Sequence, residues 1–201
     1  MKDIASHLFK IEPAYRQPAA GHILVSQPFN DDEYIYHGVA TVIDYLADEG
    51  ATGVVLNNKS EYTLDRLLDG VEVPGIPVFC GGPTGQDRLF FIHTLGPDII
   101  EGARRYCDGL YVGGNFDSAI DYINRGYPVE GYIRFFIGYA NWTEGELERE
   151  INGGHWGTVP GTATPDNVLT GSGDHYWHRF VRRLGRQYRS WQLLPKNPAC
   201  N

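Results

Sequence analysis

The residues that could bind a ligand come from separate segments of the chain, and each follows or ends an apolar run. Asp31, Asn57, His93 and Trp142 all lie near the end of a predicted strand. Strand ends often meet at one rim, and polar groups that converge on a pocket form the usual ligand site. We therefore expect these four residues to line a binding rim. The alternative is that Asp31 and Asn57 cap turns and that His93 is a buried, hydrogen-bonded histidine.

A glycine-rich loop, Gly81-Gly82-Pro83, follows the apolar run 76–80 and precedes Arg88. Phosphate-binding loops also follow a strand. Here, however, no Gly-Lys-Ser/Thr follows and the next segment reads as a strand, which excludes a P-loop. The loop and Arg88 stay candidates for binding a ligand, partly through the backbone. The alternative is a turn whose glycines supply positive φ angles.

Catalysis would require a nucleophile, an acid–base pair or a metal. The sequence shows no G-x-S-x-G elbow, no Ser-His-Asp order and no metal-ligand spacing. If 76–80 and 88–93 pair around their loop, Cys80 lies about 17 Å from His93, too far for a thiol–imidazole dyad. We expect no catalytic residues, cofactor or metal. The alternative is an enzyme that uses a pocket near His93 and Glu148 for acid–base chemistry.

Basic residues gather at the end of the chain. Residues 174–201 carry a local charge of +5, which leaves −13 for the rest of a chain whose net charge is −8. A helix predicted over about 174–189 has an apolar stripe and a basic stripe at helical spacing, Arg179, Arg182, Arg183 and Arg186. Guanidinium groups bind phosphates and carboxylates equally well. The stripe predicts contact with nucleic acid or an acidic partner, and the favoured alternative is packing against the acidic body.

Composition places the chain among ordinary globular proteins. Of 201 residues, 42% are hydrophobic and 21% charged, which excludes a disordered chain. The 25 glycines and 12 prolines favour many short elements, and three unpaired cysteines indicate a reducing compartment. No apolar run reaches the roughly 18 residues that cross a bilayer, and the start lacks an apolar signal region. We expect a cytoplasmic protein with no membrane partner, an extension at 1–20 and one domain at 21–201.

Local patterns assign most of the chain. Residues 39–48 read as a strand because of their β-branched content, with a helix as the alternative. A Thr-x-x-Glu capping box opens a helix over about 144–152. Residues 157–173 read mostly as loop. The other predicted strands are 21–26, 53–56, 76–80, 88–93, 109–114 and 132–142, and the other predicted helices are 2–11, 63–69, 98–106, 116–125 and 174–189.

Several blocks occur in an order typical of one family. They are GHILVSQP (21–28) with Asp31 and Tyr34, GATGVVLN (50–57), GGP (81–83) with RLFFIH (88–93), FIGYANW (136–142), GELE (145–148) and Trp156. With these blocks the chain resembles the AlgH/YqgE family of bacterial proteins. The first 20 residues and the tail beyond Trp156 match poorly.

The resemblance implies an α+β fold with a branched β-sheet, partly closed into a small barrel and surrounded by helices. Family members are largely uncharacterised, and a role in transcriptional regulation has been proposed for some. Together with the residues above, this predicts a non-catalytic binding or regulatory protein that recognises a small ligand or a protein partner. Nucleic-acid binding through the basic helix is the other alternative.

Overall fold

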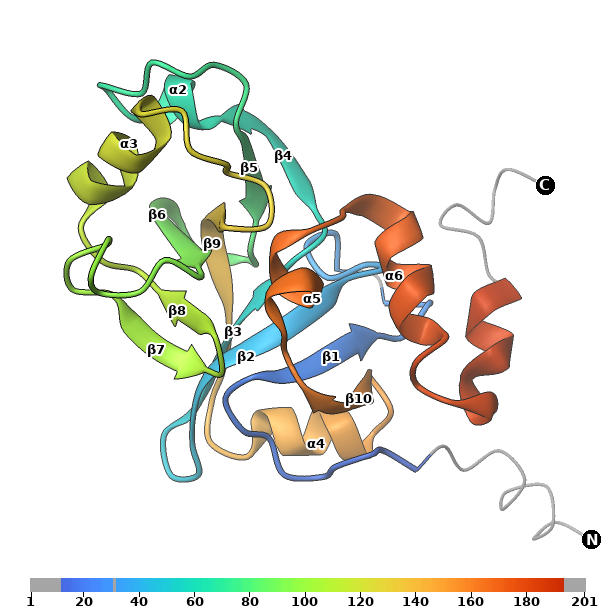
Figure 1. The fold of residues 1–201 in the computed structure, drawn as a ribbon. Helices are drawn as coiled ribbons and strands as arrows, with labels where there is room; N and C mark the ends of the chain where they lie inside the picture. Colours follow the sequence, from blue (N-terminus) through green and yellow to red (C-terminus); the bar gives the residue numbers. More distant parts are fainter. Residues whose placement is uncertain (1–11, 31, 194–201) are drawn as a thin grey trace, which may run out of the picture.

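The computed structural model describes residues 12–30 and 32–193 (Figure 1). The helix expected at 2–11 and the candidate residue Asp31 lie outside the described residues. In the described part of the chain, no helix is long and apolar enough to cross a membrane. The strands are β1 (His22–Ser26), β2 (Val39–Leu46), β3 (Gly50–Val55), β4 (Lys59–Thr63), β5 (Pro77–Cys80), β6 (Thr84–His93), β7 (Arg104–Cys107), β8 (Leu110–Val112), β9 (Ile133–Trp142) and β10 (Trp156–Thr162). The helices are α2 (Leu64–Leu67), α3 (Phe116–Asn124), α4 (Glu146–Asn152), α5 (Pro165–Leu169), α6 (Gly173–Val181) and the 3-10 helix η1 (Arg186–Leu193).

The strands form one large, mainly antiparallel sheet in the order β10-β1-β2-β3-β9-β6-β8-β7. The α+β class is confirmed. The sheet branches at β9, because Phe135–Ile137 pair in parallel with β5 while Ala140–Trp142 pair with β3. The expected small barrel was wrong: β10 and β7 stand at opposite ends of this order and do not pair, so the sheet stays open.

The strands on either side of the Gly81–Pro83 loop do not pair with each other, so the pairing considered for Cys80 and His93 does not occur. Strand β9 lies between them, parallel to β5 and antiparallel to β6. This strand is the most apolar segment of the chain, and Phe135 and Phe136 are fully buried in it. Its central place buries more apolar surface than a two-stranded hairpin would.

The strand prediction for 39–48 is confirmed by β2, and the helices at 63–69, 116–125 and 144–152 are confirmed within the usual boundary error. Two predictions were wrong. The segment 98–106 forms turns and then β7, because its last residues pair with β8. The segment 157–173 holds β10, which pairs with β1, and α5, which begins at Pro165 after the capping Thr164.

The single helix predicted over 174–189 is divided in two. Helix α6 ends at Val181, and Gly185 takes a φ of +108°, a conformation that interrupts a right-handed helix. The 3-10 helix η1 follows. The basic residues therefore lie on α6, on the connecting turn and on η1, and do not form one straight stripe.

Three groups of buried side chains hold the helices on the sheet. Helices α5, α6 and η1 cover one face of β1–β3, where Trp177 and Phe180 are fully buried. Helix α4 packs Leu147 and Ile151 against the other face. Helices α2 and α3 pack beside β5 and β6, on the far side of the molecule from α6 (Figure 1). Burying each large apolar side chain contributes about 1.5–3 kcal/mol, so this packing fixes the α5–α6 connection against the sheet.

Candidate functional site

Asn57 ties three segments together. Its side chain is buried, its Nδ2 donates to the carbonyls of His37 (2.9 Å) and Gly173 (3.2 Å), and its Oδ1 accepts from the Val39 N–H (2.8 Å). All of its donors and its acceptor are used. Asn57 therefore acts as a structural link between β2 and the start of α6.

His93 is completely buried. The Leu95 N–H donates to Nδ1 (3.2 Å), so the neutral ring carries its proton on Nε2 and donates to the Gly113 carbonyl (3.1 Å). Burial lowers the pKa of His93. Among the described residues, no carboxylate forms an ion pair with it. The structure thus gives His93 the surroundings of a hydrogen-bonded core histidine.

Trp142 and Glu148 belong to a different part of the molecule. The Trp142 indole donates to Glu150 Oε2 (2.8 Å), which also accepts from the Trp156 indole (2.8 Å). The Tyr45 hydroxyl donates to Glu148 (2.6 Å). These contacts engage both residues on the α4 face of the sheet, and no contact brings Glu148 to His93.

The Gly81-Gly82-Pro83 loop packs closely on β9. A Cβ on Gly81 would lie 2.3 Å from the Gly138 carbonyl oxygen, and the Gly82 carbonyl accepts from the Gln86 side chain. The two glycines are needed for this close approach and are buried. Pro83 and Arg88 are exposed, and Arg88 borders a shallow hollow of about 300 Å³ on the sheet.

The four arginines of the predicted stripe remain without carboxylate partners among the described residues. The Arg179 guanidinium lies over the Tyr176 ring (4.7 Å), and that of Arg183 lies over Phe180 (5.0 Å). Arg182 and Arg186 are exposed. Helix α6 packs on the sheet as the favoured alternative expected, but its arginines form no ion pairs with described carboxylates.

An unpredicted histidine–carboxylate cluster lies at the start of α6. Asp174 contacts His37 Nδ1 through one oxygen (2.5 Å) and His178 Nε2 through the other (3.3 Å). The His37 ring stacks on Trp177, with centroids 3.9 Å apart. Asp174 and His178 are one helical turn apart, so α6 itself brings these two side chains together. Among the described residues, no group of three or more histidine, cysteine, aspartate or glutamate side chains is arranged so that it could hold a metal ion.

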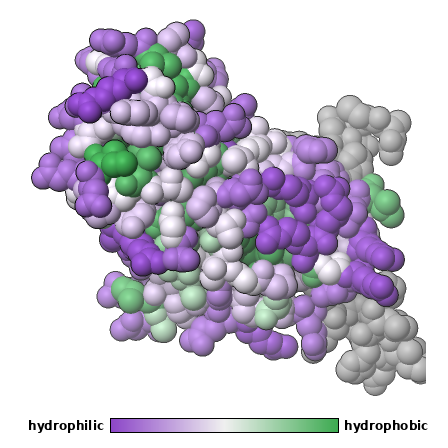
Figure 2. Space-filling model, in the orientation of Figure 1, coloured by the Kyte–Doolittle hydropathy of each residue, from purple (hydrophilic) through white to green (hydrophobic). Residues whose placement is uncertain are grey.

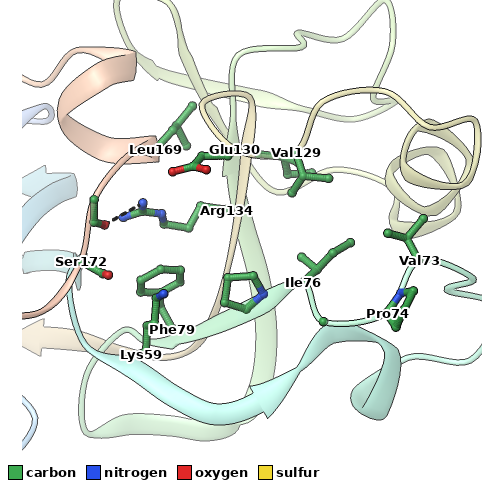
Figure 3. Close-up of a pocket in the computed structure, with 14 residues that line it drawn as sticks. Lys59, Val73, Pro74, Ile76, Phe79, Val129, Glu130, Arg134, Leu169 and Ser172 are labelled. Carbon is green, nitrogen blue, oxygen red and sulfur yellow. Dashed lines mark hydrogen bonds between the residues drawn. The ribbon is translucent and has the colours of Figure 1, made fainter.

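The strongest candidate site is a pocket of about 370 Å³ that lies between the α5–α6 connection and the strands β5 and β9 (Figure 3). Its polar side chains are Arg134, Lys59, Glu130 and Ser172, and Gly171 contributes backbone. Its apolar lining is formed by Val73, Pro74, Ile76, Pro77, Phe79, Val129, Ile133 and Leu169. The pocket therefore combines an apolar wall with a small number of charged groups.

Arg134 dominates the electrostatics of this pocket although only 6% of its surface is exposed. Its Nη1 donates to the Leu56 carbonyl (2.9 Å) and its Nη2 to the Gly171 carbonyl (3.0 Å), while the guanidinium lies 4.3 Å over the Phe79 ring. Burial lowers the pKa of Arg134 to about 10, so the group stays cationic at neutral pH. No described carboxylate lies within ion-pair distance of it.

The sequence positions these groups by alternation and by a glycine-rich connection. In β9, Arg134 points to the opposite side of the strand from its neighbours Ile133 and Phe135. The chain Thr170-Gly171-Ser172-Gly173 links α5 to α6 and brings a free carbonyl to the guanidinium. Sequence reasoning missed Arg134. The available signal was a lone arginine inside the most apolar strand, because arginine is almost never buried without a partner.

A second hollow, of about 460 Å³, adjoins this pocket and shares Lys59 with it. It is lined by Tyr34, Tyr36, Asn58 and Cys80, and by the predicted candidate Asn57. The Asn58 side chain is held by the Tyr34 carbonyl (2.7 Å). Of the predicted ligand-site residues that the structure describes, only Asn57 lines the hollow beside the strongest pocket.

The sequence of this chain is similar to those of known proteins. A family model described as AlgH-like matches residues 23–189, which reaches well beyond Trp156 and includes the basic residues of α6. A UPF0301 protein of Parabacteroides distasonis is 38% identical over 196 residues, 97% of this chain and 98% of that protein. A UPF0301 protein of Bacteroides thetaiotaomicron is 33% identical over 200 residues, 99% of this chain and all of that protein.

Two solved structures share the fold. A crystal structure of a protein from Corynebacterium diphtheriae has a TM-score of 0.73 at 20% identity and covers 92% of this chain and 96% of that chain. The solution structure of AlgH from Pseudomonas aeruginosa has a TM-score of 0.64 at 24% identity and covers 87% and 92%. The likeness to these two extends to the fold alone. The family model and the curated relatives show that the chain belongs to the AlgH-like family, whose members are uncharacterised.

Proposed function

We propose that this protein is a non-catalytic binding protein whose ligand is a small organic anion with an apolar body, held in the Arg134 pocket. One observation carries the proposal. Arg134 is a buried cation, 6% exposed, and has no carboxylate partner among the described residues. A buried charge without an ion-pair partner is costly, and a bound anion would supply that partner.

The size of this cost follows from the pKa of Arg134. A fall from 12.5 to about 10 corresponds to about 3 kcal/mol by which the fold penalises the charged form. The Phe79 ring and two carbonyl groups offset the penalty only in part, because neither carries a full negative charge. An anion beside the guanidinium would recover much of it.

The rest of the pocket supports an apolar body on the ligand. Val73, Ile76, Val129 and Leu169 form its wall, and each ligand methylene that they cover contributes about 0.8 kcal/mol. A volume of about 370 Å³ lies near the lower end of the usual range for ligand sites, which favours a small molecule. Lys59 adds a second cation at the border with the adjoining hollow.

Binding is proposed instead of catalysis because of the pocket's lining. Among the described residues that line the pocket there is no histidine or cysteine, the side chains that most often serve as acid–base groups or nucleophiles. Its acid, Glu130, favours the charged form of Arg134 electrostatically but forms no ion pair with it. The charge that Arg134 lacks is therefore left for a bound molecule to provide.

The proposal is tested with a matched pair of fluorescent probes. 8-Anilinonaphthalene-1-sulfonate has an aromatic body and a sulfonate, and N-phenyl-1-naphthylamine has nearly the same body without charge. We expect the sulfonate probe to bind more tightly, and octanoate to displace it while octanol does not. Equal affinity for the two probes, or equal displacement by octanoate and octanol, would contradict the proposal that the pocket recognises a negative charge on its ligand.

A further inference from the structure

A second set of positively charged residues lies on α6, the turn after it and η1. In the view of Figure 2, strongly hydrophilic side chains gather over this region. Between residues 173 and 193 the chain carries five arginines, at 179, 182, 183, 186 and 189, and a single acid, Asp174. We refer to these five residues as the arginine surface.

The arginine surface is not neutralised within the described part of the molecule. None of its five arginines forms an ion pair with a described carboxylate. Asp174, the one acid of the segment, is already in contact with His37 and His178. The nearby Asp166 accepts from the Thr170 hydroxyl within α5. The positive charge of this surface is therefore open to a partner.

Part of the surface is held in place before any partner arrives. The guanidinium of Arg179 lies over Tyr176 and Phe180, and that of Arg183 lies over Phe180 and donates to Asn167 Oδ1 (2.9 Å). Arg179 Nη2 is buried and has no hydrogen-bond partner in the described residues. Stacked, planar guanidinium groups lose little side-chain entropy when they bind a carboxylate with two hydrogen bonds.

An exposed apolar residue distinguishes between two kinds of anionic partner. Leu193, at the end of η1, is 82% exposed and lies on the same short helix as Arg186 and Arg189. Protein interfaces combine arginines with apolar anchors, whereas a phosphate backbone offers no apolar contact. The rest of the chain is strongly acidic, so a long polyanion would meet repulsion outside this surface.

From these observations we propose that the arginine surface is a protein interface that binds an acidic segment carrying an apolar residue. Glutamate or aspartate side chains pair with Arg182 and Arg186, and the apolar residue packs against Leu193. Arg182 and Arg186 do not line the Arg134 pocket. The function of this interface is to dock the protein onto an acidic partner.

The test uses fluorescence anisotropy with three labelled probes on the full chain. The first is a short peptide of glutamate and leucine, the second its glutamine counterpart, and the third a single-stranded oligonucleotide of similar length. The test variant is Arg182→Glu/Arg186→Glu. The matched control, Arg66→Glu/Arg149→Glu, changes the net charge equally at exposed arginines on α2 and α4.

We expect the glutamate peptide to bind, more weakly at higher salt, and the glutamine peptide not to bind. The Arg182→Glu/Arg186→Glu variant binds the glutamate peptide with a Kd about tenfold higher or more. The control variant changes the Kd by less than about twofold. Leu193→Ser lowers the affinity for the glutamate peptide without changing how steeply that affinity falls with salt. Tighter binding of the oligonucleotide, or equal loss in test and control variants, would overturn the proposal.

Discussion

Replacing Arg134 with methionine removes the buried charge while keeping most of the length of the side chain. The variant loses hydrogen bonds to the Leu56 and Gly171 carbonyls, each of which contributes about 1.5–3 kcal/mol because the donor is charged. It also escapes the desolvation cost of about 3 kcal/mol that lowers the pKa of Arg134. We therefore expect Arg134→Met to lower the free energy of unfolding by only about 0–3 kcal/mol.

The same substitution affects anion binding much more than stability. A charge-assisted hydrogen bond from Arg134 to a sulfonate contributes about 1.5–3 kcal/mol, so its loss raises the Kd of the sulfonate probe by about 10- to 150-fold. The Kd of the uncharged probe changes by less than about threefold, since the apolar wall is intact. Arg134→Lys keeps the charge but not both carbonyl bonds and gives an intermediate Kd.

The assay is fluorescence titration of both probes, with urea unfolding of each variant as the stability measurement. Arg88→Met serves as the matched control, because Arg88 is exposed and borders a different hollow. Sulfonate binding is also expected to hold from neutral pH upward and to weaken as pH rises through about 10, where Arg134 loses its proton. An equal change in both probes, or no change in either, would refute this reasoning.

Three further predictions concern stability and are measured by urea unfolding. Because burial lowers the pKa of His93, the unfolded chain binds that proton more readily. Stability therefore falls as pH drops below about 6.5, by up to about 1.4 kcal/mol per pH unit, and His93→Gln reduces this slope. Gly81→Ala costs more than about 3 kcal/mol because its Cβ would lie 2.3 Å from a carbonyl oxygen, whereas Gly126→Ala, with open space around it, costs about 1 kcal/mol. Glu150→Ala costs about 2–4 kcal/mol and alters tryptophan fluorescence by freeing two buried indole N–H groups, whereas Glu150→Gln keeps the accepting oxygen and costs less. The first prediction is contradicted if the free energy of unfolding does not change with pH below about 6.5. The second and third are contradicted if the two glycine variants, or the two Glu150 variants, lose the same stability.

Local sequence patterns were sufficient to predict a helix or strand where the residues of that segment alone determine its structure. The capping residue Asn115 accepts from the Ser118 N–H, and Leu147 and Ile151 form the buried stripe of α4, as their spacing indicates. The β-branched residues of 39–46 form a central strand. In each case the deciding interactions lie within a few residues of one another.

The pairing partners of the strands could not be read from such patterns. Strands β5 and β6 flank a short loop, yet β9, which begins 40 residues after β6 ends, lies between them. Closure into a barrel likewise depends on whether two distant edge strands meet. These outcomes depend on burial across the whole sheet, which local propensity does not contain.

The candidate site was difficult to predict for a similar reason. Asn57 and His93 are polar residues near strand ends, but in the structure their hydrogen bonds are used within the fold. The sequence around Arg134 does not show what lies over it, and in the structure the α5–α6 connection contacts its guanidinium through the Gly171 carbonyl. The role of each of these polar residues therefore depends on which segments, distant in the sequence, pack against it.

The most direct measurement of the central claim is a crystal structure of the protein with 8-anilinonaphthalene-1-sulfonate bound. The account predicts the sulfonate within hydrogen-bond distance of the Arg134 guanidinium and the aromatic rings against Ile76 and Val129. A probe bound elsewhere, or one in this pocket with its sulfonate turned away from Arg134, would contradict it.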